Sequence, residues 1–340
     1  MKNRNGRQPN PLRVLTYHRV ANFEDRPWLN PGLISATPDM FCEQMEFLYR
    51  NYCVVSIEQV LEAVERKALL PNRAVLITFD DAYRDFAENA WPILKRLNLA
   101  TTLFVPTAYP GHPERLFWWD KLHQVFSRMQ ESVSEIAPIG SVSHNTPEER
   151  RRQGLKQFQG YIKNLPDDEA MKRVDELYDR IKGPKVEAAV LDWEELRQLT
   201  KDGVTLGAHT RTHPALTRVG LETAREEITA SQTDLKREIG TVLPIFSYPD
   251  GRHDESIVDI LKEEGFQIAF NGPAGCNDLS SCDPYRIRRI NITPRTSPIV
   301  FRLRLARWFT PIDRFRHRKR IRDITSSYCY YEDGHARTAG

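Results

Sequence analysis

The sequence predicts an α/β protein whose parallel strands form a barrel. Short apolar runs rich in β-branched residues alternate with helical patterns, and strands joined through helices pair in parallel because a parallel connection needs a crossover. About seven such units occur, enough to close a barrel or to form an open doubly wound sheet. No glycine-rich phosphate loop follows the first strand, and this favours the barrel.

The expected strands and helices follow one another in regular order. The strands are residues 13–17, 53–56, 74–79, 101–105, 204–208, 244–248 and 267–270. The helices are expected at about 38–50, 57–67, 83–97, 192–201, 219–239 and 254–264. Two helices carry start signals: Thr37 precedes Pro38, and Ser56 lies three residues before Gln59, as in a capping box.

One long stretch breaks the alternation. Residues of about 115–190 are polar and helix-prone, and we interpret them as a helical insertion on the barrel rather than a separate domain. The barrel with its insertion is then expected over residues 12–300. Residues 301–340 form a basic C-terminal tail rich in arginine.

Composition excludes several classes of protein. Hydrophobic residues make up 40% of the chain and charged residues 28%, the balance of a soluble globular protein. No apolar run approaches the roughly 20 residues of a membrane span, and the basic N-terminus lacks the apolar stretch of a signal peptide, which predicts a cytoplasmic protein. The net charge of +3 predicts no nucleic-acid binding. The 5 cysteines are scattered without a CxxC pair, which predicts reduced thiols.

Two polar motifs at strand ends suggest a metal site. Asp80 and Asp81 follow the strand 74–79, and His209 and His213 follow the strand 204–208. The carboxyl ends of barrel strands meet on one face, so these groups are expected to converge. Taken singly, the aspartates could cap a helix and the histidines could be ordinary core or surface residues. Together, two histidines and one carboxylate form a set that leaves coordination positions open.

Two further segments follow strands and are more ambiguous. Tyr248-Pro249-Asp250-Gly251 bends the chain after the strand 244–248, and such a loop can aim a backbone N–H at an oxyanion or be a plain turn. His18 follows the first strand. It could be a general acid or a structural histidine.

These motifs, in this order, resemble the polysaccharide deacetylase family, the NodB-homology domain of carbohydrate esterase family 4. The resemblance rests on Thr78–Asp81, His209–His213 and Tyr248–Gly251, with Tyr17–Val20 in support. It covers roughly residues 12–295, most weakly in the insertion. It implies a distorted, incomplete (β/α) barrel of NodB type and a metal-dependent hydrolase that removes acetyl groups from N-acetylated sugars.

The resemblance also implies roles for individual residues. Asp80 corresponds to the general base, and Asp81, His209 and His213 correspond to the ligands of one divalent metal ion. Zinc is the first expectation for this ion, with cobalt and nickel as alternatives. The backbone N–H of Tyr248 would contribute to the oxyanion site.

The sequence departs from the common family pattern at two points. No arginine precedes the Tyr248 motif, and the only late histidines are His317 and His335, in the tail. This resembles the rearranged branch typified by poly-N-acetylglucosamine deacetylases of exopolysaccharide biosynthesis, in which an early Tyr-His segment supplies the acid. His18 is therefore the expected general acid. The partner of Asp80 stays open, with Arg84 and Asp85 as candidates.

The implied substrate is an N-acetylated sugar polymer or oligosaccharide. Trp118, Trp119, Pro249 and Gly251 are candidate substrate-binding residues, although the two tryptophans could instead pack the insertion onto the barrel. One alternative is a deacylase of a lipid-linked or small N-acyl sugar, and another is an inactive carbohydrate-binding homologue. The arginine-rich segment 300–325 predicts weak association with anionic membrane surfaces, at the inner face of the membrane.

Overall fold

A parallel sheet forms the centre of the molecule. The computed structural model describes residues 11–112, 114–128, 146–162, 164–180 and 188–306. The strands of the sheet are β1 (Arg13–Tyr17), β4 (Cys53–Val54), β5 (Ala74–Phe79), β6 (Thr102–Val105), β7 (Thr205–Ala208), β8 (Ile245–Ser247), β9 (Ile268–Phe270) and β10 (Ile290–Asn291). Their order is β10-β1-β5-β6-β7-β8-β9 with β4 beside β5, and every pairing is parallel. All seven strands expected from the sequence are therefore present.

One segment, residues 287–291, connects the two edges of this sheet. Ile287 bridges to Phe270 of β9, and three residues later Ile290 of β10 pairs with Leu15 of β1. The circle of strands is thus completed only by an isolated bridge and a two-residue strand. The expected distorted, incomplete barrel is confirmed.

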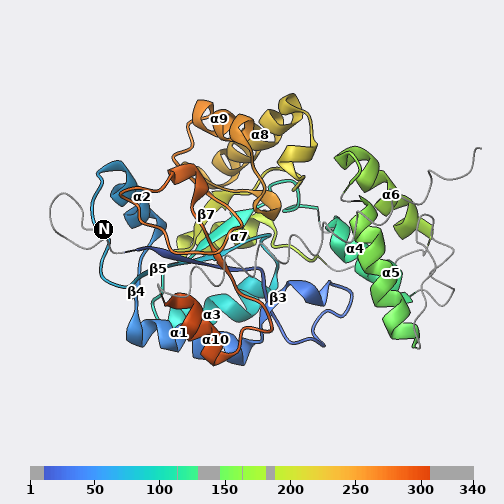
Figure 1. The fold of residues 1–340 in the computed structure, drawn as a ribbon, viewed down its shortest axis with the longest axis horizontal. Helices are drawn as coiled ribbons and strands as arrows, with labels where there is room; N and C mark the ends of the chain where they lie inside the picture. Colours follow the sequence, from blue (N-terminus) through green and yellow to red (C-terminus); the bar gives the residue numbers. More distant parts are fainter. Residues whose placement is uncertain (1–10, 113, 129–145, 163, 181–187, 307–340) are drawn as a thin grey trace, which may run out of the picture.

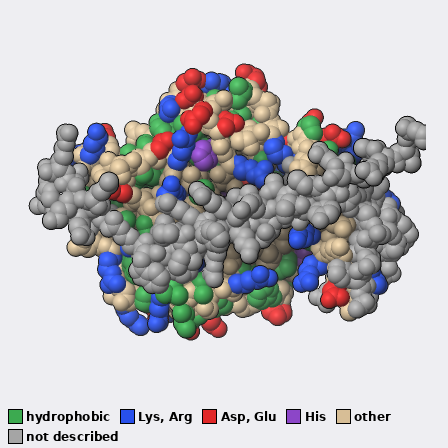
Figure 2. Space-filling view, viewed as in Figure 1, with side chains coloured by type: hydrophobic (Ala, Val, Ile, Leu, Met, Phe, Trp, Pro, Cys, Tyr) green, Lys and Arg blue, Asp and Glu red, His purple; other side chains and the backbone are tan. Residues whose placement is uncertain are grey.

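Helices cover the sheet on two sides. They are α1 (Pro38–Asn51), α2 (Ile57–Glu65), α3 (Trp91–Arg96), α7 (Trp193–Lys201), α8 (Leu221–Ile239), α9 (Glu255–Glu263) and α10 (Pro298–Leu305). In Figure 1, α8 and α9 lie above the strands, and α1, α3 and α10 lie below them. The predicted N-caps are confirmed: Thr37 accepts from the Met40 N–H, and Ser56 with Gln59 forms a capping box. Acidic and basic side chains are interspersed over the face displayed in Figure 2. This agrees with the near balance of the whole chain, which has 49 Lys and Arg residues and 46 Asp and Glu residues.

The insertion forms a separate cluster of helices at one side of the barrel (Figure 1). It contains α4 (Trp118–Arg128), α5 (Pro147–Ile162) and α6 (Asp167–Arg180). Apolar side chains of all three helices pack together, among them Phe126, Phe158 and Val174. The insertion therefore has a small apolar core of its own beside the main one.

Some elements were not expected. The strands β2 (Arg19–Val20) and β3 (Ile34–Ala36) pair as a small second sheet, and these strands are too short to show a periodic pattern. The predicted helix 83–97 is instead a π-helical turn over Phe86–Ala90 followed by α3. Its start is displaced because Asp81 and Ala82 have positive φ angles and Tyr83 bridges to Val190.

Helix α10 runs across the expected boundary at residue 300. Its Phe301 and Leu305 are buried, and Phe301 contacts Phe47 of α1 edge-on. The arginine-rich chain beyond residue 306, with its expected membrane association, lies outside the described residues. Among the described residues, no helix combines the length and apolar character needed to cross a membrane.

A buried ion pair connects the small sheet to the segment after β5. Arg19 and Asp85 are both fully buried, and Arg19 Nε donates to Asp85 Oδ2 at 2.8 Å. The other oxygen of Asp85 accepts from the Val20 backbone N–H at 3.1 Å. Burial raises the pKa of Asp85, and Arg19 opposes that rise. The pair therefore fixes the loop after β1 against the loop after β5.

Removing one partner of this pair should destabilise the protein strongly. We expect Asp85→Ala to lower the free energy of unfolding by about 3–5 kcal/mol, because it leaves a buried guanidinium uncompensated. Glu46→Ala breaks the exposed Arg50–Glu46 pair on α1 and should cost less than about 1 kcal/mol. Urea unfolding of both variants measures the difference. Equal, small changes would show that Arg19 finds solvent or another partner.

Candidate active site

The two candidate carboxylates leave β5 in a sharply turned backbone. Asp80 continues the strand, since its N–H donates to the Tyr17 carbonyl at 3.0 Å. Asp81 and Ala82 then take φ angles of 73° and 51°, in the left-handed region that non-glycine residues seldom adopt. Both aspartates are buried. The turn lets consecutive residues project to different partners.

The two histidines leave β7 in a similar turn. Thr210 (φ 61°) and His213 (φ 64°) both adopt left-handed conformations. The Thr210 hydroxyl donates to the His209 carbonyl at 2.5 Å and accepts from the His213 N–H at 3.0 Å. The HxxxH spacing thus works through a tight turn rather than a helix, and it brings the two ring centroids within 4.7 Å.

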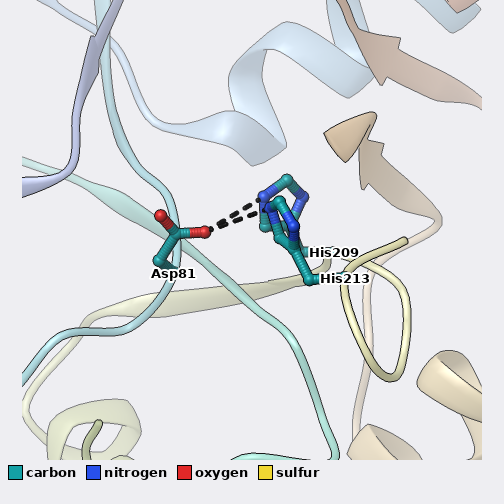
Figure 3. A group of neighbouring side chains, drawn as sticks. All are labelled: Asp81, His209 and His213. Carbon is teal, nitrogen blue, oxygen red and sulfur yellow. Dashed lines mark ion pairs between the residues drawn. The ribbon is translucent and has the colours of Figure 1, made fainter. Parts of the chain in front are cut away.

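Asp81, His209 and His213 converge on one point (Figure 3). Oδ1 of Asp81 lies 3.5 Å from Nε2 of His209 and 3.4 Å from Nε2 of His213. This oxygen is buried and accepts no hydrogen bond from the described residues. Because buried carboxylate oxygens are normally satisfied, an unpartnered one between two imidazoles fits a bound cation.

The orientation of His209 supports this interpretation. Its Nδ1 lies 2.7 Å from the Ser247 carbonyl, which can only accept, so Nδ1 carries the hydrogen and the Nε2 lone pair is left for a metal. Burial alone would lower the pKa of His209, but Asp80 and Asp81 raise it above its usual value. Burial would raise the pKa of Asp81, yet His209, His213 and His18 hold it below its usual value. Burial, together with His209, lowers the pKa of His213 although Asp81 opposes this, so positive charge beside Asp81 is favoured on His209 rather than on His213.

The charge partner of Asp80 is Arg289, which the sequence did not suggest. The guanidinium binds both carboxylate oxygens, with Nη1–Oδ1 and Nη2–Oδ2 each 2.8 Å, and both side chains are buried. Burial raises the pKa of Asp80, but Arg289 and His209 lower it far below its usual value. Arg84 pairs with Glu195 and Asp85 with Arg19, so both candidate partners were wrong. Arg289 lies directly before β10, far from the Tyr248 motif in sequence.

His18 lies on the same face as the carboxylates. Its backbone N–H donates to the Ser35 hydroxyl at 2.9 Å, which fixes the chain after β1, and its side chain is partly exposed. Its charge contributes to lowering the pKa of both Asp80 and Asp81, as expected for a neighbour of both. The position suits a proton donor, and the role of acid stays a prediction.

The Tyr248 loop is held by its own backbone contacts. The Tyr248 N–H donates to the Phe270 carbonyl at 3.1 Å, so it could bind an oxyanion only by giving up that bond. Pro249 is buried, and Gly251 has a φ of 66°. A Cβ on Gly251 would lie 2.3 Å from the backbone nitrogen of Gly272. Gly251 is thus required by close backbone packing, and a role in substrate binding stays a prediction.

The two tryptophans occupy different environments. Trp119 is buried, and its ring stacks on Phe117 at 4.6 Å and meets His213 edge-on at 5.0 Å. Trp118 lines a cavity of about 260 Å³ between the insertion and the loop after β7. His213 and Asp250 also line this cavity. Trp119 therefore packs the insertion onto the site, and Trp118 lines the cavity beside it.

The protein is thus an α/β barrel whose strand ends bring together two imidazoles and a carboxylate that could hold a metal ion. Beside them lies the buried Asp80–Arg289 pair. The family model "Polysaccharide deacetylase" matches residues 67–269, more than half of the chain. The chain belongs to this family.

The chain is similar to several other proteins over most of its length. It is 18% identical to the Bacillus subtilis (strain 168) protein described as "Putative polysaccharide deacetylase YxkH" over 295 residues, covering 86% of this chain and 76% of that protein. Among solved structures, the Streptococcus pyogenes deacetylase PplD in complex with acetate has a TM-score of 0.59 at 19% identity, covering 88% of this chain and 100% of that one. IcaB from Ammonifex degensii has a TM-score of 0.58 at 18% identity, covering 88% and 99%. At these identities the structures support the fold.

Replacing Arg289 should raise the pKa of Asp80. Arg289 favours the ionised carboxylate, so in Arg289→Met burial dominates and Asp80 takes up a proton at higher pH. If Asp80 must be ionised for acetate release, the acid limb of the kcat/KM–pH profile moves to higher pH than in the wild type. Arg295→Met, an exposed arginine of the following loop, serves as the control. An unchanged acid limb in Arg289→Met would mean that another group controls it.

Proposed function

We propose that this protein is a metal-dependent hydrolase that removes N-acetyl groups from N-acetylhexosamine units of a polysaccharide or oligosaccharide, in exopolysaccharide or cell-envelope biosynthesis. The observation that carries the proposal is the buried Asp81–His209–His213 cluster, whose Asp81 Oδ1 has no hydrogen bond from the described residues. The family supplies the reaction class, and the cluster supplies the groups that the reaction needs.

The cluster offers two imidazole nitrogens and one carboxylate oxygen to a divalent ion. This donor set suits zinc, and also cobalt or nickel, and three protein ligands leave positions open for water and substrate. When bound, such an ion polarises the amide carbonyl and lowers the pKa of water. The Nδ1–Ser247 bond keeps His209 in the tautomer that can bind it.

Asp80 is the proposed general base. The double contact with Arg289 keeps its carboxylate ionised near neutral pH and fixes its orientation, so it can accept the proton of the attacking water. Its Oδ2 also lies 4.0 Å from Nε2 of His209, which places it next to the metal ligands. Orientation and protonation state are therefore set before substrate binds.

His18 is the proposed general acid. An amide nitrogen is a poor leaving group unless it is protonated, and an imidazole can hold a proton near neutral pH. The influence of His18 on the pKa of both aspartates supports its presence beside the reacting groups. Products would be acetate and the free amino sugar, and acetate is the ligand named with the PplD structure.

The cavity beside His213 supports sugar binding. Trp118 and Met171 offer apolar surface to a sugar ring, and Asp167 and Asp250 offer acceptors to hydroxyl groups. The inserted helices enclose this cavity on one side. A small or lipid-linked N-acyl sugar is therefore the second candidate substrate. The intact ligand set disfavours an inactive carbohydrate-binding homologue. Acetate release from a panel of acetylated sugars and polymers, with and without chelator, tests all three.

Three alanine variants of the proposed ligands and one variant of Asp80 should separate the metal site from the base. Asp81→Ala should lose metal, because it removes one ligand of three, and His209→Ala and His213→Ala should behave alike. Asp80→Asn should keep metal and lose at least roughly 10²-fold in kcat, because the amide cannot accept the proton. Elemental analysis and acetate release measure the two effects. Full metal occupancy in all three alanine variants would rule out the ligand assignment.

The acid can be tested by changing the leaving group. His18→Gln should keep fold and metal and cut turnover of an N-acetyl substrate by roughly 10²–10⁴-fold. An activated acetyl ester needs no protonation of its leaving group, so its hydrolysis should fall much less. His112→Gln, at an exposed histidine paired with Glu114, is the control. Equal losses on amide and ester would refute the acid role.

A further inference from the structure

The two proposed metal-binding histidines are held in place by different forces. His209 is fixed by its hydrogen bond to Ser247, a residue of the sheet. His213 instead packs against two aromatic rings, Trp119 at 5.0 Å and Phe117 at 5.8 Å, each with an interplanar angle of 79°. Such edge-to-face contacts are directional, so the orientation of His213 depends on the orientation of those rings.

Trp119 is itself oriented by a chain of buried hydrogen bonds. Its Nε1 donates to the Tyr83 hydroxyl at 2.7 Å, and that hydroxyl donates to Asp120 Oδ2 at 2.7 Å. The second oxygen of Asp120 accepts from the Asn30 backbone N–H at 2.6 Å. Asp120 and Tyr83 have no exposed surface, and Trp119 has 7%.

The direction of this chain is fixed by chemistry. An indole N–H can only donate, so the Tyr83 oxygen accepts from it and its hydroxyl hydrogen goes to Asp120. Only a group with two acceptors can receive both the Tyr83 hydroxyl and the Asn30 N–H, and the two oxygens of the Asp120 carboxyl group do so. An amide at residue 120 would present an NH₂ group to one of these two donors. The chain therefore specifies aspartate at this position.

The same chain of hydrogen bonds connects the loop of one proposed ligand, Asp81, with the helix that contacts another, His213. Tyr83 follows Asp81 by two residues in the turn after β5, whereas Trp119 and Asp120 belong to the first turn of α4 in the insertion. Asn30 belongs to the segment before β3. The loop that carries Asp81 is thus bonded to the helix that packs on His213.

We propose that Asp120 is a positioning residue of the metal site, which acts through Tyr83 and Trp119 to hold His213 and makes the inserted helix α4 a part of that site. The inference rests on the metal site of the proposed function but not on the identity of the substrate. Direct hydrogen-bond partners of metal-ligating histidines typically change metal affinity 10–100-fold when they are removed, and Asp120, which acts through two further side chains, is expected to have an effect at the lower end.

The test compares two buried polar residues of α4. Asp120→Asn keeps the shape of the side chain and interrupts the chain of hydrogen bonds. Gln124→Met removes another buried polar group, which accepts from Tyr178 within the insertion at 3.3 Å and does not belong to the chain. Calorimetric titration of metal-free protein with Zn²⁺ should show affinity roughly 10-fold weaker in Asp120→Asn and nearly unchanged in Gln124→Met. Equal affinities in all three proteins, or equal losses in both variants, would overturn the proposal.

Tyr83→Phe provides a second, independent arm. It interrupts the same chain, so the double variant Tyr83→Phe/Asp120→Asn should lose no more affinity than the larger single loss. Losses that multiply would show that the two residues act separately and would overturn the proposal.

A third measurement needs no metal. The ring resonances of His213 in the NMR spectrum of the metal-free protein, assigned with His213→Gln, should move in Asp120→Asn and stay in place in Gln124→Met. Unmoved His213 resonances in Asp120→Asn overturn the positioning role even if the wild type binds no zinc. Absence of zinc binding by the wild type would instead count against the proposed function.

Discussion

Two consecutive buried carboxylates at the end of β5 impose the constraint around which the site is built. Burial of an ionised carboxylate is costly, so each must be matched by positive charge or by protonation. Asp80 is matched by the guanidinium of Arg289, and Asp81 by the imidazoles of His209 and His213. This division gives the two carboxylates different chemistry, because one is satisfied by the protein and the other retains a buried oxygen without a hydrogen bond from the described residues.

The sequence predicted those parts of the fold and site that leave a local signal. The strands β1 and β5 have the bounds expected from their apolar runs, and the placement of polar motifs after strands predicted that they would meet at one end of the barrel. Arg289 left no comparable signal, because it is separated from Asp80 by 209 positions and reaches it only through the pairing of β10 with β1. A charge partner supplied by tertiary structure cannot be found from spacing. The nearest available clue was Arg288-Arg289 directly before the short alternating segment Ile290-Asn291-Ile292.

The insertion illustrates a second limit of reasoning from the sequence. Its helices were predicted from composition, but the sequence assigned none of its residues to the metal cluster. The hydrogen bonds of Asp120 and the ring contact of Trp119 with His213 instead join α4 to the barrel at the cluster. The apolar core shared by α4, α5 and α6 holds α4 from the other side. Variation in this insertion is therefore expected to alter both the cavity beside Trp118 and the support of His213.

Backbone conformation at the site shows what the barrel must stabilise. Asp81, Ala82, Thr210, His213 and Asp250 all have positive φ angles, and all lie in loops that follow β5, β7 or β8. Each such residue costs on the order of 1 kcal/mol relative to an ordinary conformation, and the cost is tolerated only where the surroundings determine the backbone. Here the surroundings are the fully buried strand β5, the Thr210 hydroxyl bonds and the Gly251–Gly272 backbone contact. Because the conformation that gathers the ligands is held by packing outside the site, loosening of the barrel should disperse the cluster before the fold is lost.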